Sequence, residues 1–188
     1  MKRVLLFVLC LTMVLSLCAC GEDSTSQEGV KETETAAPQE DVQETKMVTA
    51  AVASMYVMNM SKEMDGSYSG ISAAGIEASR KLVDECIVLI RSNRVINAIV
   101  EAYQADGGTH VPDAAALRKA LRMESVEETA LMRITVLPFA EGVTDEELLL
   151  MCKAVLDVAP RIVEAVMNDL VSLKPVDKPI LQQIEIEK

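Results

Sequence analysis

Two cysteines, Cys18 and Cys20, stand where an apolar run gives way to an acidic, serine-rich stretch, in "LSLCACGEDSTSQEG". Lys2 and Arg3 precede the apolar run, which is the order of basic and apolar regions in a secretion signal. The run covers residues 4–17 and is shorter than the roughly 20 apolar residues that span a bilayer, so a transmembrane helix is the weaker interpretation. We therefore predict a signal peptide, with a thiol placed at its end.

The three residues before Cys20 are Leu17, Cys18 and Ala19, and they resemble the lipobox of bacterial lipoproteins. That motif has a branched apolar residue at position minus three, a small residue at minus one, and then the cysteine that receives the lipid. Cys18 is a poorer acceptor because Leu17 would occupy its minus-one position. The alternative is an ordinary secretion signal that is cut after Ala19. We predict lipidation at Cys20, a signal peptide over 1–19, and a protein anchored to the outer face of the bacterial cytoplasmic membrane.

The mature chain is strongly acidic. Removing 1–19 takes away two basic residues and no acid, so the formal charge goes from −11 to −13. Such a chain is repelled by nucleic acid and by anionic headgroups, which leaves the lipid to hold it to the membrane. Residues 20–45 contain eight acidic residues, one basic residue (Lys31) and almost no large apolar side chains. This segment cannot bury enough surface to fold, so we predict a disordered tether that carries the folded domain over 46–188.

Few other residues could do chemistry. His110 is the only histidine, and Asp106 precedes it by four positions in a glycine-containing loop. A metal site or a catalytic dyad needs more partners than this pair supplies, so we interpret His110 as part of a solvent-exposed turn. Three carboxylates in "MESVEE", at Glu124, Glu127 and Glu128, could hold a cation, but a solvated helix end explains them better. We predict no enzyme activity, no cofactor and no metal.

Two further cysteines, Cys86 and Cys152, remain in the mature chain besides Cys20. One disulfide is possible, but a disulfide framework is not. Each cysteine lies on the apolar face of a predicted helix, which favours two buried free thiols over a bridge.

The hydrophobic pattern predicts an α+β fold, a small sheet with helices packed on it. Apolar residues on both alternating faces of 46–60 indicate a strand that is buried on both sides, and "TALMRITVLP" alternates like a half-buried strand. The prolines of "VSLKPVDKPI" restrict that segment to the edge of a sheet. We expect a loop over 62–70 between the first strand and the first helix.

Helices are predicted between these strands. Apolar residues recur at spacings of three and four from Ile76 to Ile90, and "RSN" then separates this helix from a second one that "ADGG" ends. Pro112 suits the first turn of a short helix that carries Leu117 and Leu121. "TDEE" is a capping box for a long helix whose apolar stripe runs from Leu148 to Leu170, with a proline inside it.

This order of elements resembles the extracytoplasmic domain of the Wzz-type chain-length determinants and their capsule relatives, the polysaccharide co-polymerases. "AAVASMYV" resembles the first strand of that family, "LIRSNRVINAIVEAY" its serine-containing helix junction, and "ALRKALRMESVEETALMRITV" its short helix that leads into a strand. "VSLKPVDKPI" resembles its proline-containing stretch before the second membrane helix. The chain departs from the family at both ends, because a lipidated cysteine replaces the first membrane helix and only nine residues follow Pro179.

The resemblance implies a non-catalytic scaffold or regulator in the chain-length control or export of capsular polysaccharide or exopolysaccharide. Its implied partners are other copies of the chain or a membrane protein of polysaccharide synthesis. The alternative is a monomeric ligand-binding or inhibitory surface lipoprotein that is unrelated to polysaccharide.

Overall fold

The computed structural model describes residues 45–61 and 73–187. These residues form five antiparallel strands and four helices, which confirms the predicted α+β class. Cys20, the signal peptide, the tether up to residue 44 and the whole predicted loop over 62–70 lie outside the described residues. The elements in chain order are β1 (Thr45–Asn59), α2 (Ala73–Ile90), α3 (Asn93–Ala105), α4 (Ala114–Ala120), β2 (Leu121–Ser125), β3 (Leu131–Val136), α5 (Asp145–Val166), β4 (Val171–Pro175) and β5 (Ile180–Glu187).

The long strand β1 organises the sheet. It pairs with β3 on one side, and β2 extends the sheet beyond β3. On its other side β1 pairs with two strands in succession, with β5 along Thr45–Val52 and with β4 along Met55–Asn59. Its 15 residues are enough for both partners. The predicted strands β1 and β3 are confirmed, and so is the predicted position of β4 at an edge of the sheet.

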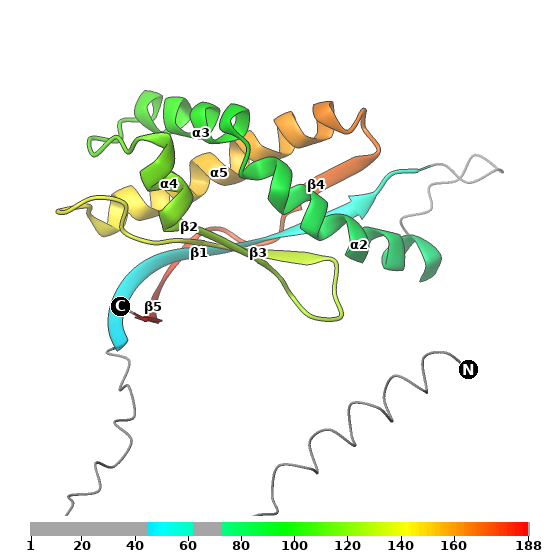
Figure 1. The fold of residues 1–188 in the computed structure, drawn as a ribbon, viewed down its shortest axis with the longest axis horizontal. Helices are drawn as coiled ribbons and strands as arrows, with labels where there is room; N and C mark the ends of the chain where they lie inside the picture. The colour runs from blue at the N-terminus through cyan, green and yellow to red at the C-terminus, as the bar shows by residue number, and fades with distance from the viewer. Residues whose placement is uncertain (1–44, 62–72, 188) are drawn as a thin grey trace, which may run out of the picture. The chain divides into compact units, whose positions relative to one another are not determined.

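The helices lie on one side of this sheet (Figure 1). On that side β1 buries every second residue, including Ala53, Met55 and Val57. The alternate residues Val52 and Tyr56 are only half-buried. The prediction that β1 is buried on both sides is therefore wrong for one of its faces, because no described helix covers that face.

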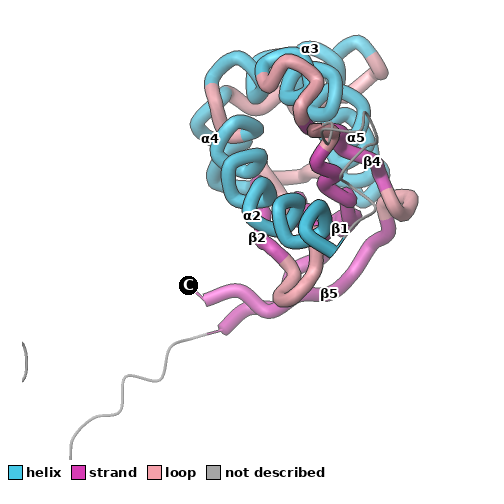
Figure 2. The backbone as a smooth tube through the Cα atoms, turned by 90° about the vertical axis from the view of Figure 1, so that its right-hand side faces the viewer, coloured by secondary structure: helices cyan, strands magenta, loops and turns pink. Residues whose placement is uncertain are grey.

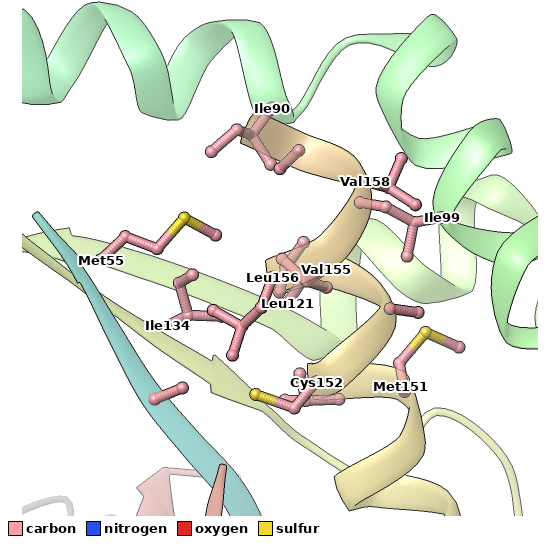
Figure 3. Close-up of a cluster of buried hydrophobic side chains, with 14 of the residues drawn as sticks. Met55, Ile90, Ile99, Leu121, Ile134, Met151, Cys152, Val155, Leu156 and Val158 are labelled. Carbon is pink, nitrogen blue, oxygen red and sulfur yellow. The ribbon is translucent and has the colours of Figure 1, made fainter. Parts of the chain in front are cut away.

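The core fills the space between the helices and the sheet. Figure 3 shows its centre, where Met55 and Ile134 of the sheet face Val155 and Cys152 of α5, with Ile90 of α2 above them. All five side chains have no exposed surface. Close packing of this kind makes the core sensitive to changes in volume.

The helix boundaries follow local signals. Gly107 has φ +98° and ends α3 as predicted, and Thr144 forms the predicted capping box of α5 with Glu147. Pro160 lies inside α5, but the predicted stripe is too long, since the helix ends at Val166 and Leu170 is 53% exposed. None of the described helices is long and apolar enough to cross a membrane.

Two strands were not predicted. Leu121, expected in the short helix, instead begins β2, and α4 starts after the cap residue Asp113 rather than at Pro112. The predicted helix end at "MESVEE" is likewise wrong, because Glu124 lies in β2 and Glu128 in the β2–β3 hairpin, although both side chains are exposed as expected. The other unpredicted strand is β5, which forms a two-stranded ribbon with the first half of β1 (Figure 2).

Candidate functional site

The sheet face away from the helices is the candidate site, because its charge is opposite to that of the chain. Strand alternation and register place four cationic side chains and one carboxylate on this face. These residues are Lys46, Arg122, Arg133, Lys174 and Glu124. The whole chain has a formal charge of −11, so this open face is a basic surface on an acidic protein.

A hollow of about 230 Å³ lies on the open face where β2, β3, β1 and β5 meet. We call it the arginine pocket. Its lining combines two guanidinium groups and one carboxylate with neutral polar and apolar side chains. The lining residues are Val52, Arg122, Glu124, Arg133, Thr135, Gln182 and Ile184.

The register explains why these side chains meet. Arg122 pairs with Thr135, and Thr135 pairs with Val52, so these three residues form one row across the sheet. Glu124 pairs with Arg133 in the next row on the same face. Arg122 and Arg133 are thus diagonal neighbours on adjacent strands, which places them about 7–8 Å apart at the backbone, within joint reach of one small anion.

The two arginines are not equivalent. Arg133 Nη1 lies 3.2 Å from Glu124 Oε1, but the two side chains are 51% and 64% exposed, so water competes with this ion pair. Arg122 is exposed and makes no ion pair among the residues described. The arginine pocket therefore offers one free guanidinium and one whose present partner is exchangeable, which is chemistry for binding an anion.

The predicted lone histidine is not in a simple solvent-exposed turn. The His110 side chain is 38% exposed, and its Nδ1 lies 2.9 Å from Glu147 Oε2. This correction has a tertiary cause, because α3 packs against α5 and brings the loop after α3 over the first turn of α5. Asp106, four positions before His110, forms an ion pair with Lys153 at 2.9 Å.

Glu147 is the centre of this buried cluster, and sequence reasoning used it only as part of a capping box. Its Oε1 accepts hydrogen bonds from the Tyr103 hydroxyl at 3.1 Å, the Thr109 hydroxyl at 2.6 Å and the His110 amide at 3.0 Å. Its Oε2 accepts from the Thr144 amide at 3.1 Å. These donors, the Thr109 hydroxyl first, hold the pKa of the Glu147 carboxyl well below its usual range.

The Glu147 cluster stabilises the fold by joining two elements. The bonds from Tyr103, Thr109 and His110 fix the end of α3 and the loop after it to the start of α5. The Thr144 bond closes the cap of α5, and Glu147 as a residue is only 9% exposed. Burial and the bond to Glu147 raise the pKa of Tyr103 to about 12, so its hydroxyl stays a donor at neutral pH. Within the described part of the chain, no group of three or more His, Cys, Asp or Glu could hold a metal ion.

The two predicted free thiols are confirmed as buried. Cys86 on α2 and Cys152 on α5 are unbridged and have no exposed surface. Burial raises the pKa of each thiol to about 12, with Glu85 adding to the effect at Cys86. A thiol with so high a pKa has almost no thiolate at neutral pH and is a poor nucleophile.

We expect neither Cys86 nor Cys152 to react with a maleimide in the native protein at pH 7, and both to react after unfolding in guanidinium chloride without reductant. Mass spectrometry of a chain that starts at Gly21 gives the number of labels directly. Rapid labelling of the folded chain would contradict the burial, and a need for reductant would reveal a bridge.

A second hollow lies beside α5. It measures about 740 Å³ and runs between the half-buried side of α5 and the segment that joins β4 to β5. Leu149, Leu150 and Val176 make it largely apolar, with Lys153 and Asp177 at its margin. We call it the α5 groove.

In comparisons with known proteins, no family model matches this chain and no curated protein matches it. The resemblance to the Wzz-type domains therefore stays a prediction that rests on the local sequences given above. The lipidation of Cys20 also stays a prediction, since Cys20 lies outside the described residues.

Proposed function

We propose that this protein is a non-catalytic cell-envelope lipoprotein that scaffolds or regulates the chain-length control or export of capsular polysaccharide or exopolysaccharide. The observation that supports the proposal most directly is the open face of the sheet, which carries the arginine pocket and on which none of the described helices packs. The observed order of elements also contains the order on which the resemblance rests, with β2 and β5 added.

Anchoring follows from the amino-terminal sequence. Diacylglycerol on Cys20 would hold the chain to the outer face of the cytoplasmic membrane, and the acidic tether would let the domain reach partners above the bilayer. Anchoring raises the local concentration of neighbouring copies and of membrane proteins without creating any new contact. The partners we propose are other copies of this chain or a membrane protein of polysaccharide synthesis.

A second candidate function has its own support in the α5 groove. A hollow of about 740 Å³ with apolar walls and a few charged groups at its margin has the size and character of small-molecule sites. The competing proposal is thus a monomeric ligand-binding or inhibitory lipoprotein that is unrelated to polysaccharide.

The polymer itself tests the proposed function. In the source bacterium we expect deletion of the gene to shift the length distribution of a surface polysaccharide on gels. Cys20→Ala should shift it in the same way, because the protein would lose its anchor, and labelling with an alkyne fatty acid should show that the variant carries no lipid. An unchanged length distribution in the deletion strain, with no crosslink from the wild-type protein to a polysaccharide-synthesis membrane protein, would favour the ligand-binding lipoprotein.

A further inference from the structure

We propose that the arginine pocket binds the carboxylate of an acidic sugar within an anionic polysaccharide, with Arg122 and Arg133 holding the anion together. The inference rests on the proposed function, and it adds the chemical class of the polymer and the residues that recognise it. Arginine suits this role because its planar guanidinium forms paired hydrogen bonds with a carboxylate.

The geometry provides both guanidinium groups without a change in the fold. Arg122 and Arg133 come from the hairpin strands β2 and β3 and lie on the same face in neighbouring rows. In the free protein Glu124 pairs with Arg133 at 3.2 Å on the exposed surface. A ligand carboxylate would bind Arg122 and compete with Glu124 for Arg133, so binding replaces a weak surface ion pair and has to outweigh the repulsion from the nearby Glu124 carboxylate.

The rest of the pocket suits a sugar ring. Thr135 and Gln182 supply a hydroxyl and an amide, which can bond to sugar hydroxyls. Val52 and Ile184 supply apolar surface for the carbon–hydrogen face of the ring. The volume of about 230 Å³ admits about one monosaccharide, so a longer polymer would extend beyond the pocket.

The cationic residues continue along the open face beyond the pocket. Lys174 lies opposite Tyr56 and Lys46 lies at the other end of β1, ten residues away along the strand. The basic residues are therefore spread over four strands of the open face, on both sides of the pocket. An anionic bilayer is the less suitable partner, because a hollow of about 230 Å³ with neutral polar and apolar side chains beside its arginines admits a sugar ring and not a flat membrane surface.

Binding to defined oligosaccharides tests the pocket. The protein is the chain from Gly21, which omits the lipidated cysteine and keeps all the residues of the folded domain. The probe is a decamer of galacturonic acid, with a neutral maltodextrin of the same length and vesicles that contain phosphatidylglycerol as comparisons. We expect calorimetry to show binding of the galacturonate decamer that weakens as salt is raised, and no binding of the maltodextrin.

Variants then locate the site. Arg122→Gln and Arg133→Gln should each weaken galacturonate binding by about tenfold, since each removes charge-assisted hydrogen bonds. Arg122→Lys should lose part of the affinity, because the charge remains but the paired geometry does not. The matched control is Arg94→Gln on α3, an exposed arginine on the helical side, which should leave binding unchanged. Thermal unfolding confirms that each variant folds.

Three results would overturn the proposal. The first is that the folded wild type does not bind the galacturonate decamer. The second is that Arg94→Gln loses as much affinity for the decamer as the pocket variants do. The third is that the protein binds vesicles through Arg122 and does not bind the decamer. The polymer-length assay separates this inference from the proposed function. If gene deletion alters polymer length but the galacturonate decamer does not bind, the function stands and the pocket assignment falls. If the decamer binds through Arg122 and deletion leaves polymer length unchanged, the pocket stands and the polysaccharide role falls.

Discussion

Glu147→Gln is expected to destabilise the domain strongly at neutral pH, although the two side chains have nearly the same shape. The carboxylate accepts hydrogen bonds from the Tyr103 hydroxyl, the Thr109 hydroxyl and three backbone amides. The side-chain NH2 group of glutamine cannot accept a hydrogen bond. It would replace one carboxylate oxygen and leave the groups that donate to that oxygen without an acceptor in a buried place. Chemical denaturation at pH 7 measures the loss, which should exceed that of the cap variant Thr144→Ala, for which about 1 kcal/mol is typical.

The pH dependence of this loss has a defined sign. The folded-state pKa of Glu147 lies below its unfolded value, so the unfolded chain takes up the proton first as the pH falls. The stability that Glu147 contributes is therefore complete above the unfolded pKa of about 4.3 and is lost progressively below it. We expect wild type and Glu147→Gln to differ most at pH 6–7 and to converge as the pH is lowered from about 4.

Glu146→Gln is the matched control, because it removes the same charge from the same first turn of α5 at an exposed position. It should have little effect on stability at any pH. A loss in Glu146→Gln equal to that in Glu147→Gln would assign the effect to general helix electrostatics rather than to the buried cluster. A difference between wild type and Glu147→Gln that is independent of pH would contradict the role of the ionised carboxylate.

Gly108→Ala is expected to reduce the free energy of unfolding by about 3 kcal/mol, a large cost for one methyl group. A Cβ at Gly108 would overlap the ring of Tyr103. That ring cannot move aside easily, because it is fully buried and packs edge-on against Phe139 with ring centroids 5.7 Å apart. Displacing the ring would also break the hydrogen bond from its hydroxyl to Glu147.

Gly107→Ala serves as the control for this steric effect. A Cβ at Gly107 would meet no atom within 4 Å, but its φ of +98° is strained for alanine, which costs about 1–2 kcal/mol. Shortening the side chain at position 103 distinguishes steric overlap with the Tyr103 ring from backbone strain. In a double-variant cycle, Tyr103→Ala should cancel most of the further cost of Gly108→Ala and none of that of Gly107→Ala. Additive losses for Gly108→Ala and Tyr103→Ala would contradict the overlap.

The parts of this protein that depend on neighbours in sequence could be predicted from the sequence. The capping box at Thr144, the glycine that ends α3 and the alternation of β3 each depend on a few adjacent residues. The burial of Cys86 and Cys152 was predictable for the same reason, because the spacing of apolar residues assigns each cysteine to the buried face of its own helix.

Tertiary structure alone decided which face of the sheet stays open and which distant residues meet. Short alternating segments such as β2 gain their strand pairing from a partner elsewhere in the chain, so their own pattern did not separate strand from helix end. Glu147 and His110 are 37 positions apart, and Arg122 meets Gln182 and Ile184 only because β1 joins the two halves of the sheet. Such contacts depend on register and packing between elements, which amino-acid periodicity within one element does not encode.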